Sequence, residues 1–163
     1  MDIKLIDLKE EDLGQVKEIY DYYILNSTAT YHLEPLSETE LKRFIPINHP
    51  RFVSFMIECD QKVCGYCYLG PYKPRQAYDR TAEVTVYLNP EATNRGIGWK
   101  VMEELEKRAV KNGFRVLLGI ISADNLGSVR LMEKLGYTQC AYFKQVGEKF
   151  GRILDVVGYQ KIL

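Results

Sequence analysis

The chain has 163 residues, with 22 lysines and arginines against 22 aspartates and glutamates, and so carries no net charge at pH 7. A hydrophobic content of 46% excludes a disordered chain, and the neutral balance argues against nucleic-acid binding, which needs a basic face. No apolar run approaches the roughly 20 residues of a membrane helix, and the N-terminus lacks a signal-peptide pattern. We therefore expect a cytoplasmic protein with a single domain over residues 1–163 and no membrane partner.

Hydrophobic periodicity divides the chain into strands, whose side chains alternate, and helices of period 3.6. The expected elements in chain order are a strand over 2–8, a helix from the acidic turn 10–12 to Asn26, a helix opened by the capping box Ser37–Glu40, strands over 52–58, 62–69 and 82–88, a helix between Gly98 and Asn112, a strand over 116–121, a helix over 125–135, and two strands in 137–163. Residues 71–80, which include two prolines, are expected to form a loop. This order predicts the α/β class, as an α+β mixed sheet with helices on both faces.

Four cysteines raise the question of a metal or redox site. Cys64 and Cys67 have the CxxC spacing of such sites, but they fall in a segment that alternates as a strand does. Residues three apart on a strand face opposite sides, so the two thiols should diverge. No second CxxC is present, and the two histidines show no ligand spacing. We expect Cys59, Cys64, Cys67 and Cys140 to be reduced and non-catalytic, and no metal to be bound.

A glycine pair, Gly96 and Gly98, lies between the best-patterned strand and the long helix that follows it. Glycines at such a junction let the backbone approach a ligand, and the free N–H groups of the helix favour an anion. The alternative is a tight turn in which glycine only supplies unusual backbone angles. The P-loop of nucleotide hydrolases is absent, and Met102 stands where a dinucleotide fingerprint needs its third glycine. Both of those enzyme classes are therefore disfavoured.

Two motifs and their flanks carry a resemblance to a known family. Tyr87–Pro90, followed by Asn94–Gly98, resembles the acetyl-CoA-binding motif of the GNAT acyltransferase superfamily. Ser122–Asn125 with Ser128, followed by Leu135–Tyr137, is similar to the second motif of that superfamily. Three further segments resemble its phosphinothricin acetyltransferase branch: Ile19–Ser37, Ala77–Tyr87 and Gly151–Gly158. The resemblance covers nearly the whole chain and implies a GNAT fold and a homodimer.

The resemblance also implies a role for each matching residue. Glu83 stands at the general-base position of the family. Acetyl-CoA would contact the end of the strand, the glycine loop and the helix after it, through Val86, Tyr87, Leu88, Asn94, Arg95, Gly96, Ile97, Gly98, Trp99, Asn125 and Lys134. Within this set the strand residues would hold the pantetheine arm, the loop would hold the pyrophosphate, and the last two residues would lie nearer the reacting end and the outer end of the cofactor. The amino-acid substrate would be bordered by Tyr31, Arg75, Gln76 and Tyr78.

Two positions depart from the pattern of the family. Thr93 stands where the first motif usually begins with glutamine or arginine. Because the phosphate contacts are mainly made by the backbone, we expect a modest effect on cofactor binding. Met132 stands where many members carry a tyrosine that acts as general acid. Water, Tyr137 or no dedicated acid are the alternatives for protonating the departing thiolate.

The chemistry that these residues would support is acetyl transfer to an amine. A primary amine is mostly protonated at pH 7, so its attack on a thioester needs a base and donors for the developing oxyanion. Glu83 shares a strand face with Thr85 and Tyr87 and could accept the proton directly or through water. The alternative is a solvated glutamate, or one that is ion-paired with Arg80.

The loop over 71–80 offers candidate groups for holding the substrate. An arginine fork such as that of Arg75 can bind a carboxylate, phosphinate or sulfone oxygen by paired hydrogen bonds. The alternative is an exposed loop whose charges only keep the protein soluble.

We therefore expect an enzyme, an acetyl-CoA-dependent N-acetyltransferase. Its substrate would be the α-amine of a small amino acid or analogue, such as phosphinothricin, methionine sulfoximine or methionine sulfone. Transfer would be direct, in a ternary complex, with Glu83 as general base and without a metal. The alternatives are a catalytically weak acyl-CoA-binding sensor and an enzyme that acetylates a protein N-terminus or lysine.

Overall fold

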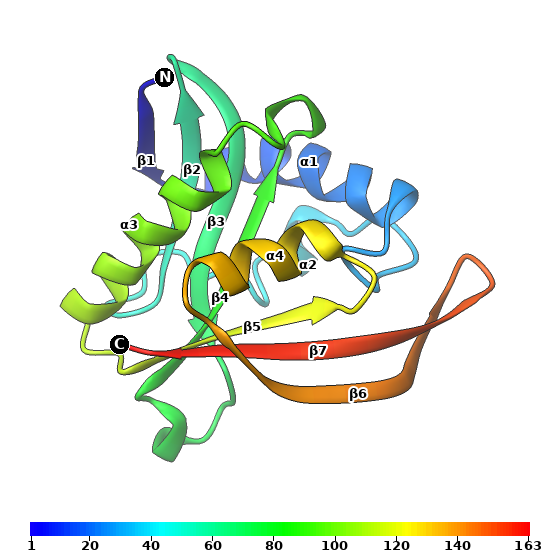
Figure 1. Cartoon of the computed structure of the whole chain (residues 1–163). Helices are drawn as coiled ribbons and strands as arrows, with labels where there is room; N and C mark the ends of the chain where they lie inside the picture. Colours follow the sequence, from blue (N-terminus) through cyan, green and yellow to red (C-terminus); the bar gives the residue numbers. More distant parts are fainter.

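A seven-stranded mixed sheet runs through the computed structural model, which describes residues 1–163 (Figure 1). In spatial order its strands are β1 (Ile3–Asp7), β2 (Val53–Cys59), β3 (Lys62–Pro71), β4 (Thr81–Leu88), β5 (Val116–Ser122), β7 (Arg152–Ile162) and β6 (Thr138–Lys149). Neighbouring strands are antiparallel except β4 and β5, which are parallel. The mixed sheet that the order of elements predicted is therefore confirmed.

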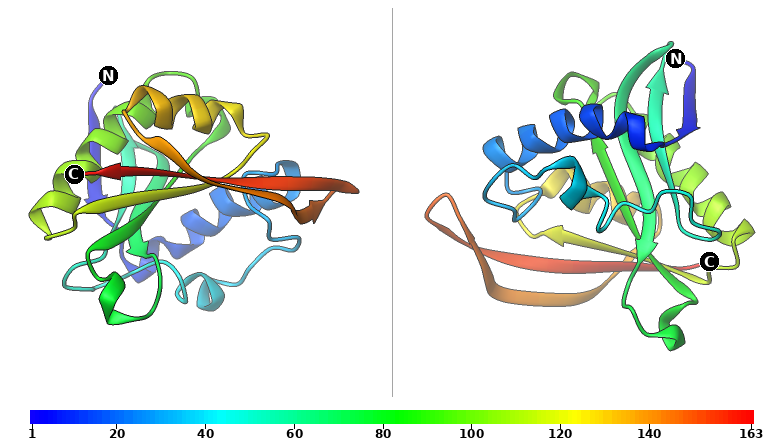
Figure 2. Two further views of the ribbon diagram at one scale, coloured as in Figure 1. Left: turned by 60° about the horizontal axis from the view of Figure 1, so that its bottom comes forward. Right: turned by 180° about the vertical axis from the view of Figure 1, so that it is seen from behind.

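Four α-helices cover the two faces of this sheet (Figures 1 and 2). They are α1 (Leu13–Asn26), α2 (Glu38–Leu41), α3 (Ile97–Lys111) and α4 (Leu126–Lys134). The larger core cluster packs α3 and α4 against one face, and a second cluster packs α1 and α2 against the other. The expectation of helices on both faces is confirmed. None of these helices is long and apolar enough to cross a membrane.

The capping box predicted at the start of α2 is present. The Ser37 hydroxyl accepts the backbone N–H of Glu40 at 3.2 Å, and the Glu40 carboxylate accepts the backbone N–H of Ser37 at 2.7 Å. The helix is short and ends at Leu41, after which the chain turns and crosses the sheet face toward β2. This crossing segment, residues 42–52, forms one wall of the cavity described below.

The structure corrects the expectation that all four cysteines are reduced. Cys59 at the end of β2 and Cys64 in β3 form a disulfide across the hairpin, with Cα atoms 6.0 Å apart. The expectation that the side chains of Cys64 and Cys67 diverge is also wrong. Cys64 is the extra residue of a β-bulge, which breaks the alternation of β3, so both cysteines pack in the same core cluster. Cys67 and Cys140 are free, as expected.

The last two strands form a long hairpin that extends past the body of the molecule (Figures 1 and 2). Its turn lies at Phe150 and Gly151, both of which have positive φ. Gly147 belongs to β6, where a Cβ would come within 2.6 Å of the Tyr31 ring. Apolar side chains along the hairpin are exposed: Tyr142, Phe143, Val146, Phe150 and Ile153.

Candidate active site

The sheet opens between β4 and β5. The two strands pair only at their beginnings, with Thr81–Glu83 beside Val116–Leu118, and then diverge (Figure 1). The side of β4 that faced β5 therefore carries backbone N–H and C=O groups over residues 84–88 that no strand of the sheet bonds. The predicted cofactor residues Val86–Leu88 lie on this open stretch. The carbonyl oxygen of Leu88 accepts a hydrogen bond from the Tyr23 hydroxyl, and the other backbone groups that face the opening are available to a ligand.

The glycine loop, which contains Gly96 and Gly98, lies at the end of this opening and leads into α3. Gly96 is the N-cap residue of α3, with φ of 78°, and no side chain caps the helix. A Cβ on Gly96 would meet nothing within 4 Å, so glycine is needed there for its backbone angle rather than for space. Gly98 differs, because its Cβ would lie 3.2 Å from the side chain of Leu131 in α4. The uncapped N–H groups and the helix dipole make this terminus suited to an anion.

The loop residues predicted to bind the pyrophosphate lie together at the N-terminus of α3, but their side chains differ in exposure. Asn94 has a positive φ of 59°, and its side chain and those of Arg95 and Trp99 are exposed. Ile97 is buried in the core, so only its backbone can reach a ligand. The arrangement supports binding of an anion mainly by the backbone.

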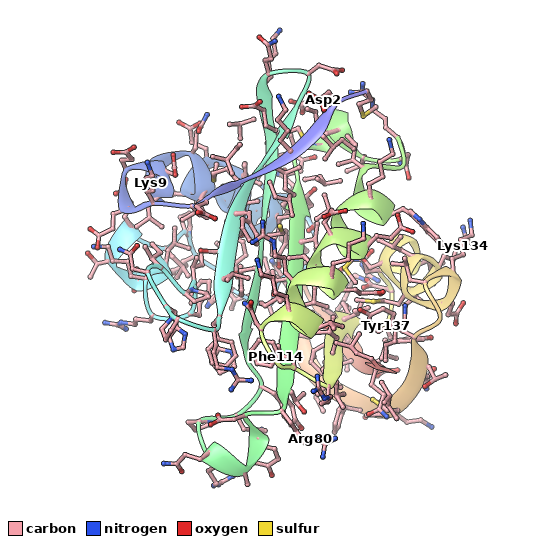
Figure 3. The ribbon with its side chains drawn as sticks, turned by 90° about the vertical axis from the view of Figure 1, so that its left-hand side faces the viewer. Asp2, Lys9, Arg80, Phe114, Lys134 and Tyr137 are labelled. Carbon is pink, nitrogen blue, oxygen red and sulfur yellow. A yellow bond between two sulfur atoms is a disulfide. The ribbon has the colours of Figure 1, made fainter.

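Asn125 and Lys134, the two remaining predicted cofactor residues, lie at the two ends of α4. Asn125 caps the helix, its side-chain oxygen accepting the N–H of Ser128 at 3.3 Å. Lys134 lies in the last turn, at the outer end of α4 in Figure 3. Nine residues of helix separate them by roughly 14 Å. One elongated ligand could therefore lie along both.

Glu83 lies at the point where β4 leaves β5. Its side chain is half-buried, makes no hydrogen bond or ion pair with this chain, and lines an open cavity of about 410 Å³. Burial raises the pKa of Glu83, and the charge of Lys73 partly offsets this. A carboxylate with a raised pKa is a stronger base than an exposed one. The ion pair with Arg80 that was considered as an alternative is not formed.

The cavity beside Glu83 has two walls. The sheet contributes Tyr68, Gly70 and Thr85 next to Glu83, and the segment that follows α2 contributes the opposite wall. Residues lining that opposite wall are Lys42, Arg43, Phe44, Ile45, Pro46, His49 and Phe52. The sequence had placed Thr85 on the face of Glu83, but the crossing segment carried no signal beyond the capping box that begins α2.

The predicted substrate residues do not line this cavity. Arg75, Gln76 and Tyr78 lie in the loop between β3 and β4, which projects from the body near Arg80 (Figure 3), and all three are exposed. Tyr31 lies elsewhere, with its hydroxyl 2.7 Å from that of Ser122 at the end of β5. Within one chain these four residues therefore do not gather around Glu83. Lys73, which sequence reasoning missed, is the loop residue whose charge acts on Glu83.

Met132, at the family's general-acid position, and Tyr137, the one side chain considered as an alternative acid, both lie in the core. Met132 is buried and packs against Gly119 of β5, where a Cβ would lie 2.4 Å from its terminal methyl. Tyr137 is also buried, and burial together with the Glu106 carboxylate raises the pKa of Tyr137. Glu106 lies nine residues along α3 from Ile97, or roughly 14 Å. Tyr137 thus holds its proton tightly at the opposite end of α3 from the glycine loop.

A split sheet beside an uncapped glycine loop, with a half-buried carboxylate at the split, defines an acyltransferase of the GNAT type. Residues 16–137 match the profile of the Acetyltransferase (GNAT) family. The chain belongs to this family and is a GNAT N-acetyltransferase.

Several relatives of this chain are acetyltransferases of the branch that the sequence predicted. The chain is 31% identical to a "Phosphinothricin N-acetyltransferase" of Streptomyces coelicolor over 94% of this chain and 92% of the relative. It is 26% identical to an "L-methionine sulfoximine/L-methionine sulfone acetyltransferase" of Pseudomonas paraeruginosa over 98% and 94%. Among solved structures, a phosphinothricin acetyltransferase of Sinorhizobium meliloti in complex with acetyl-CoA superposes with a TM-score of 0.93 at 34% identity, covering 100% of this chain and 89% of that one. The expected resemblance to the phosphinothricin acetyltransferase branch is confirmed.

Proposed function

We propose that this enzyme transfers the acetyl group of acetyl-CoA to the α-amine of a small amino acid or analogue of the phosphinothricin or methionine sulfone type. The activities of its relatives, which acetylate phosphinothricin or methionine sulfoximine and methionine sulfone, support this substrate class. The observation that carries the proposal is the cavity of about 410 Å³ that Glu83 lines, because this size suits a small molecule.

Glu83 is the proposed general base. Its carboxylate is not engaged by any side chain of the enzyme, and its raised pKa favours proton uptake. The substrate nitrogen forms the new N–C bond as Glu83 takes its proton, directly or through water. The C–S bond of the thioester breaks, and its electron pair leaves on the sulfur of the CoA thiolate. The backbone N–H groups that β4 leaves unpaired over residues 84–88 are suited to stabilise the oxygen charge that develops.

The residues present fit acetyl-CoA, which would supply the acetyl group as an activated thioester. The N-terminus of α3, with Gly96 in the left-handed region and no side-chain cap, would hold the pyrophosphate through backbone N–H groups from Asn94 to Trp99. The strand end Val86–Leu88 would hold the pantetheine arm, and Asn125 and Lys134 would contact it along α4.

The first experiment mixes the purified protein with acetyl-CoA and a panel of amines and follows acetylated product by mass spectrometry. Mass detection is preferred to a thiol-reactive dye, because Cys140 is exposed. We expect product with phosphinothricin or methionine sulfone and none with short peptides. Product with peptides alone would replace the substrate class, and binding of acetyl-CoA with no product from any amine would favour a sensor module.

We propose further that the enzyme is a homodimer that uses the exposed apolar side chains of the β6–β7 hairpin. Phe143 is 50% exposed on this hairpin, whereas Val110 is 52% exposed on α3. Phe143→Glu should shift the mass in light scattering from dimer to monomer, and Val110→Glu should not. A wild-type protein that is monomeric at micromolar concentration would contradict the proposal.

A further inference from the structure

The last turn of α1 reaches the open side of β4 through the side chain of Tyr23. This helix packs on the face of the sheet opposite to α3 (Figure 2). From there the Tyr23 hydroxyl donates a hydrogen bond to the carbonyl oxygen of Leu88, the last residue of β4. The bond therefore joins α1 to the part of β4 where the pantetheine arm of acetyl-CoA is proposed to lie.

This bond completes the support of one peptide unit, the one between Leu88 and Asn89. Its N–H, which belongs to Asn89, donates to the carbonyl oxygen of Cys64 in β3 at 2.8 Å. Its C=O, which belongs to Leu88, points the opposite way, as in every trans peptide, and meets Tyr23. Because β5 no longer pairs with β4 at this point, the Tyr23 hydroxyl takes the place of a bond from a neighbouring strand.

The position of the Tyr23 hydroxyl is itself fixed by its surroundings. The centroid of its ring lies 5.1 Å from that of Tyr87 and 5.4 Å from that of Tyr22. Its backbone carbonyl accepts both the N–H and the hydroxyl of Ser27, each at 3.1 Å, where α1 ends. Burial raises the pKa of Tyr23, so the hydroxyl keeps its proton and remains a donor. Tyr23 thus offers Leu88 a preformed hydrogen-bond donor.

The backbone groups that would meet a ligand depend on the orientation of this peptide. A residue in a strand directs its N–H and C=O to the same side, and residues two apart share that side. The N–H of Leu88 and the backbone groups of Val86 therefore face the opening together with the carbonyl that Tyr23 holds. A strand end bonded only to β3 could tilt, and the N–H of Leu88 would then turn away from the ligand.

From this geometry we infer that Tyr23 is a positioning residue for acetyl-CoA, which acts by holding the Leu88–Asn89 peptide from the open side of β4. The inference rests on the proposed function, which places the pantetheine arm along Val86–Leu88. Tyr23 acts through Leu88 and needs no contact with the reacting atoms. Its hydroxyl should therefore affect the affinity for acetyl-CoA and leave proton transfer at Glu83 unchanged.

The test is Tyr23→Phe, which keeps the ring and its packing and removes the hydroxyl. Calorimetric titration should show a Kd for acetyl-CoA that is roughly 3- to 10-fold higher, as for the loss of one neutral hydrogen bond. KM for acetyl-CoA should rise by the same factor, while kcat and KM for the amine stay within about twofold. Hydrogen exchange of the peptide that covers residues 86–92 should become faster in the unliganded variant, because its strand end is held on one side only.

The matched control is Tyr20→Phe, in the same helix. Tyr20 packs against the same ring, with its centroid 5.3 Å from that of Tyr87, but its hydroxyl bonds the side chains of Thr30 and His32 instead of β4. This variant also loses a hydrogen bond within the aromatic cluster. We expect a comparable fall in Tm, a Kd for acetyl-CoA within about twofold of wild type, and unchanged exchange over residues 86–92.

Three outcomes decide against the inference. An unchanged Kd in Tyr23→Phe overturns it while the proposed function stands, and so does an equal loss of affinity in both variants, which would indicate general packing. A wild type that does not bind acetyl-CoA overturns the inference and the proposed function together. A wild type that binds acetyl-CoA but acetylates no amine overturns the proposed function alone, because the Kd and exchange measurements still decide the role of Tyr23.

Discussion

Gly70 of β3 stands directly opposite Glu83 of β4, so the residue beside the proposed base has no side chain. Directly opposed residues in a sheet project on the same face. A Cβ on Gly70 would make ordinary contacts, 3.5 Å from the Tyr68 ring and 3.9 Å from the Phe44 carbonyl oxygen. The absence of a longer side chain therefore helps to keep the cavity open next to Glu83.

This relationship predicts a graded effect of size at Gly70. Gly70→Ala should be tolerated, with KM for the amine within about threefold of wild type, because its methyl group makes only ordinary contacts. Gly70→Leu should fill the cavity and raise KM for the amine roughly tenfold or more, on the scale of several lost contacts. Steady-state kinetics measures both, and the Kd for acetyl-CoA should stay unchanged. Equal KM values for the two variants would place the amine elsewhere.

Glu83→Gln should prevent the side chain from taking up the proton of the amine, while its size and shape stay nearly the same. We expect kcat to fall by roughly 10²–10⁴-fold, the usual contribution of a general base, with little change in the Kd for acetyl-CoA. Because burial raises the pKa of Glu83, activity should fall as pH drops through a value above that of an ordinary glutamate. This acidic limb should be absent from the profile of the variant. A pH–rate profile identical in shape to that of the wild type would remove Glu83 from the mechanism.

The charge of Lys73 should influence the pH at which activity falls on the acidic side of the profile. Its positive charge favours the ionised form of Glu83 and lowers the pKa of that carboxyl, against the larger effect of burial. Lys73→Gln should therefore raise this pKa and move the acidic limb of kcat/KM to higher pH, most clearly at low salt. Lys111→Gln, at the exposed end of α3, serves as the control and should leave the limb in place. A shift to lower pH in the Lys73 variant would contradict the assignment.

Local patterns in the sequence predicted the parts of the site that are built from neighbouring residues. Gly96 and Gly98 follow a well-patterned strand, and the alternation of β4 placed Glu83 and Thr85 on one face, as the structure has them. The cavity could not be predicted in this way, because Phe44 and Glu83 are distant in sequence and meet only through tertiary packing. Alternation also failed at Cys64, where a bulge reverses the side-chain direction.

The glycine loop offers a test that separates strain from binding. Gly96 and Gly151 both have positive φ, 78° and 68°, and a Cβ on either would meet nothing within 4 Å. Alanine at each position should destabilise the fold by a similar amount, about 1–2 kcal/mol for the left-handed backbone. Only Gly96→Ala should also weaken acetyl-CoA binding, because its helix N-terminus is the proposed pyrophosphate site, whereas Gly151 lies in the hairpin turn. Thermal unfolding and calorimetric titration measure the two effects, and equal affinities in the two variants would move the pyrophosphate away from this loop.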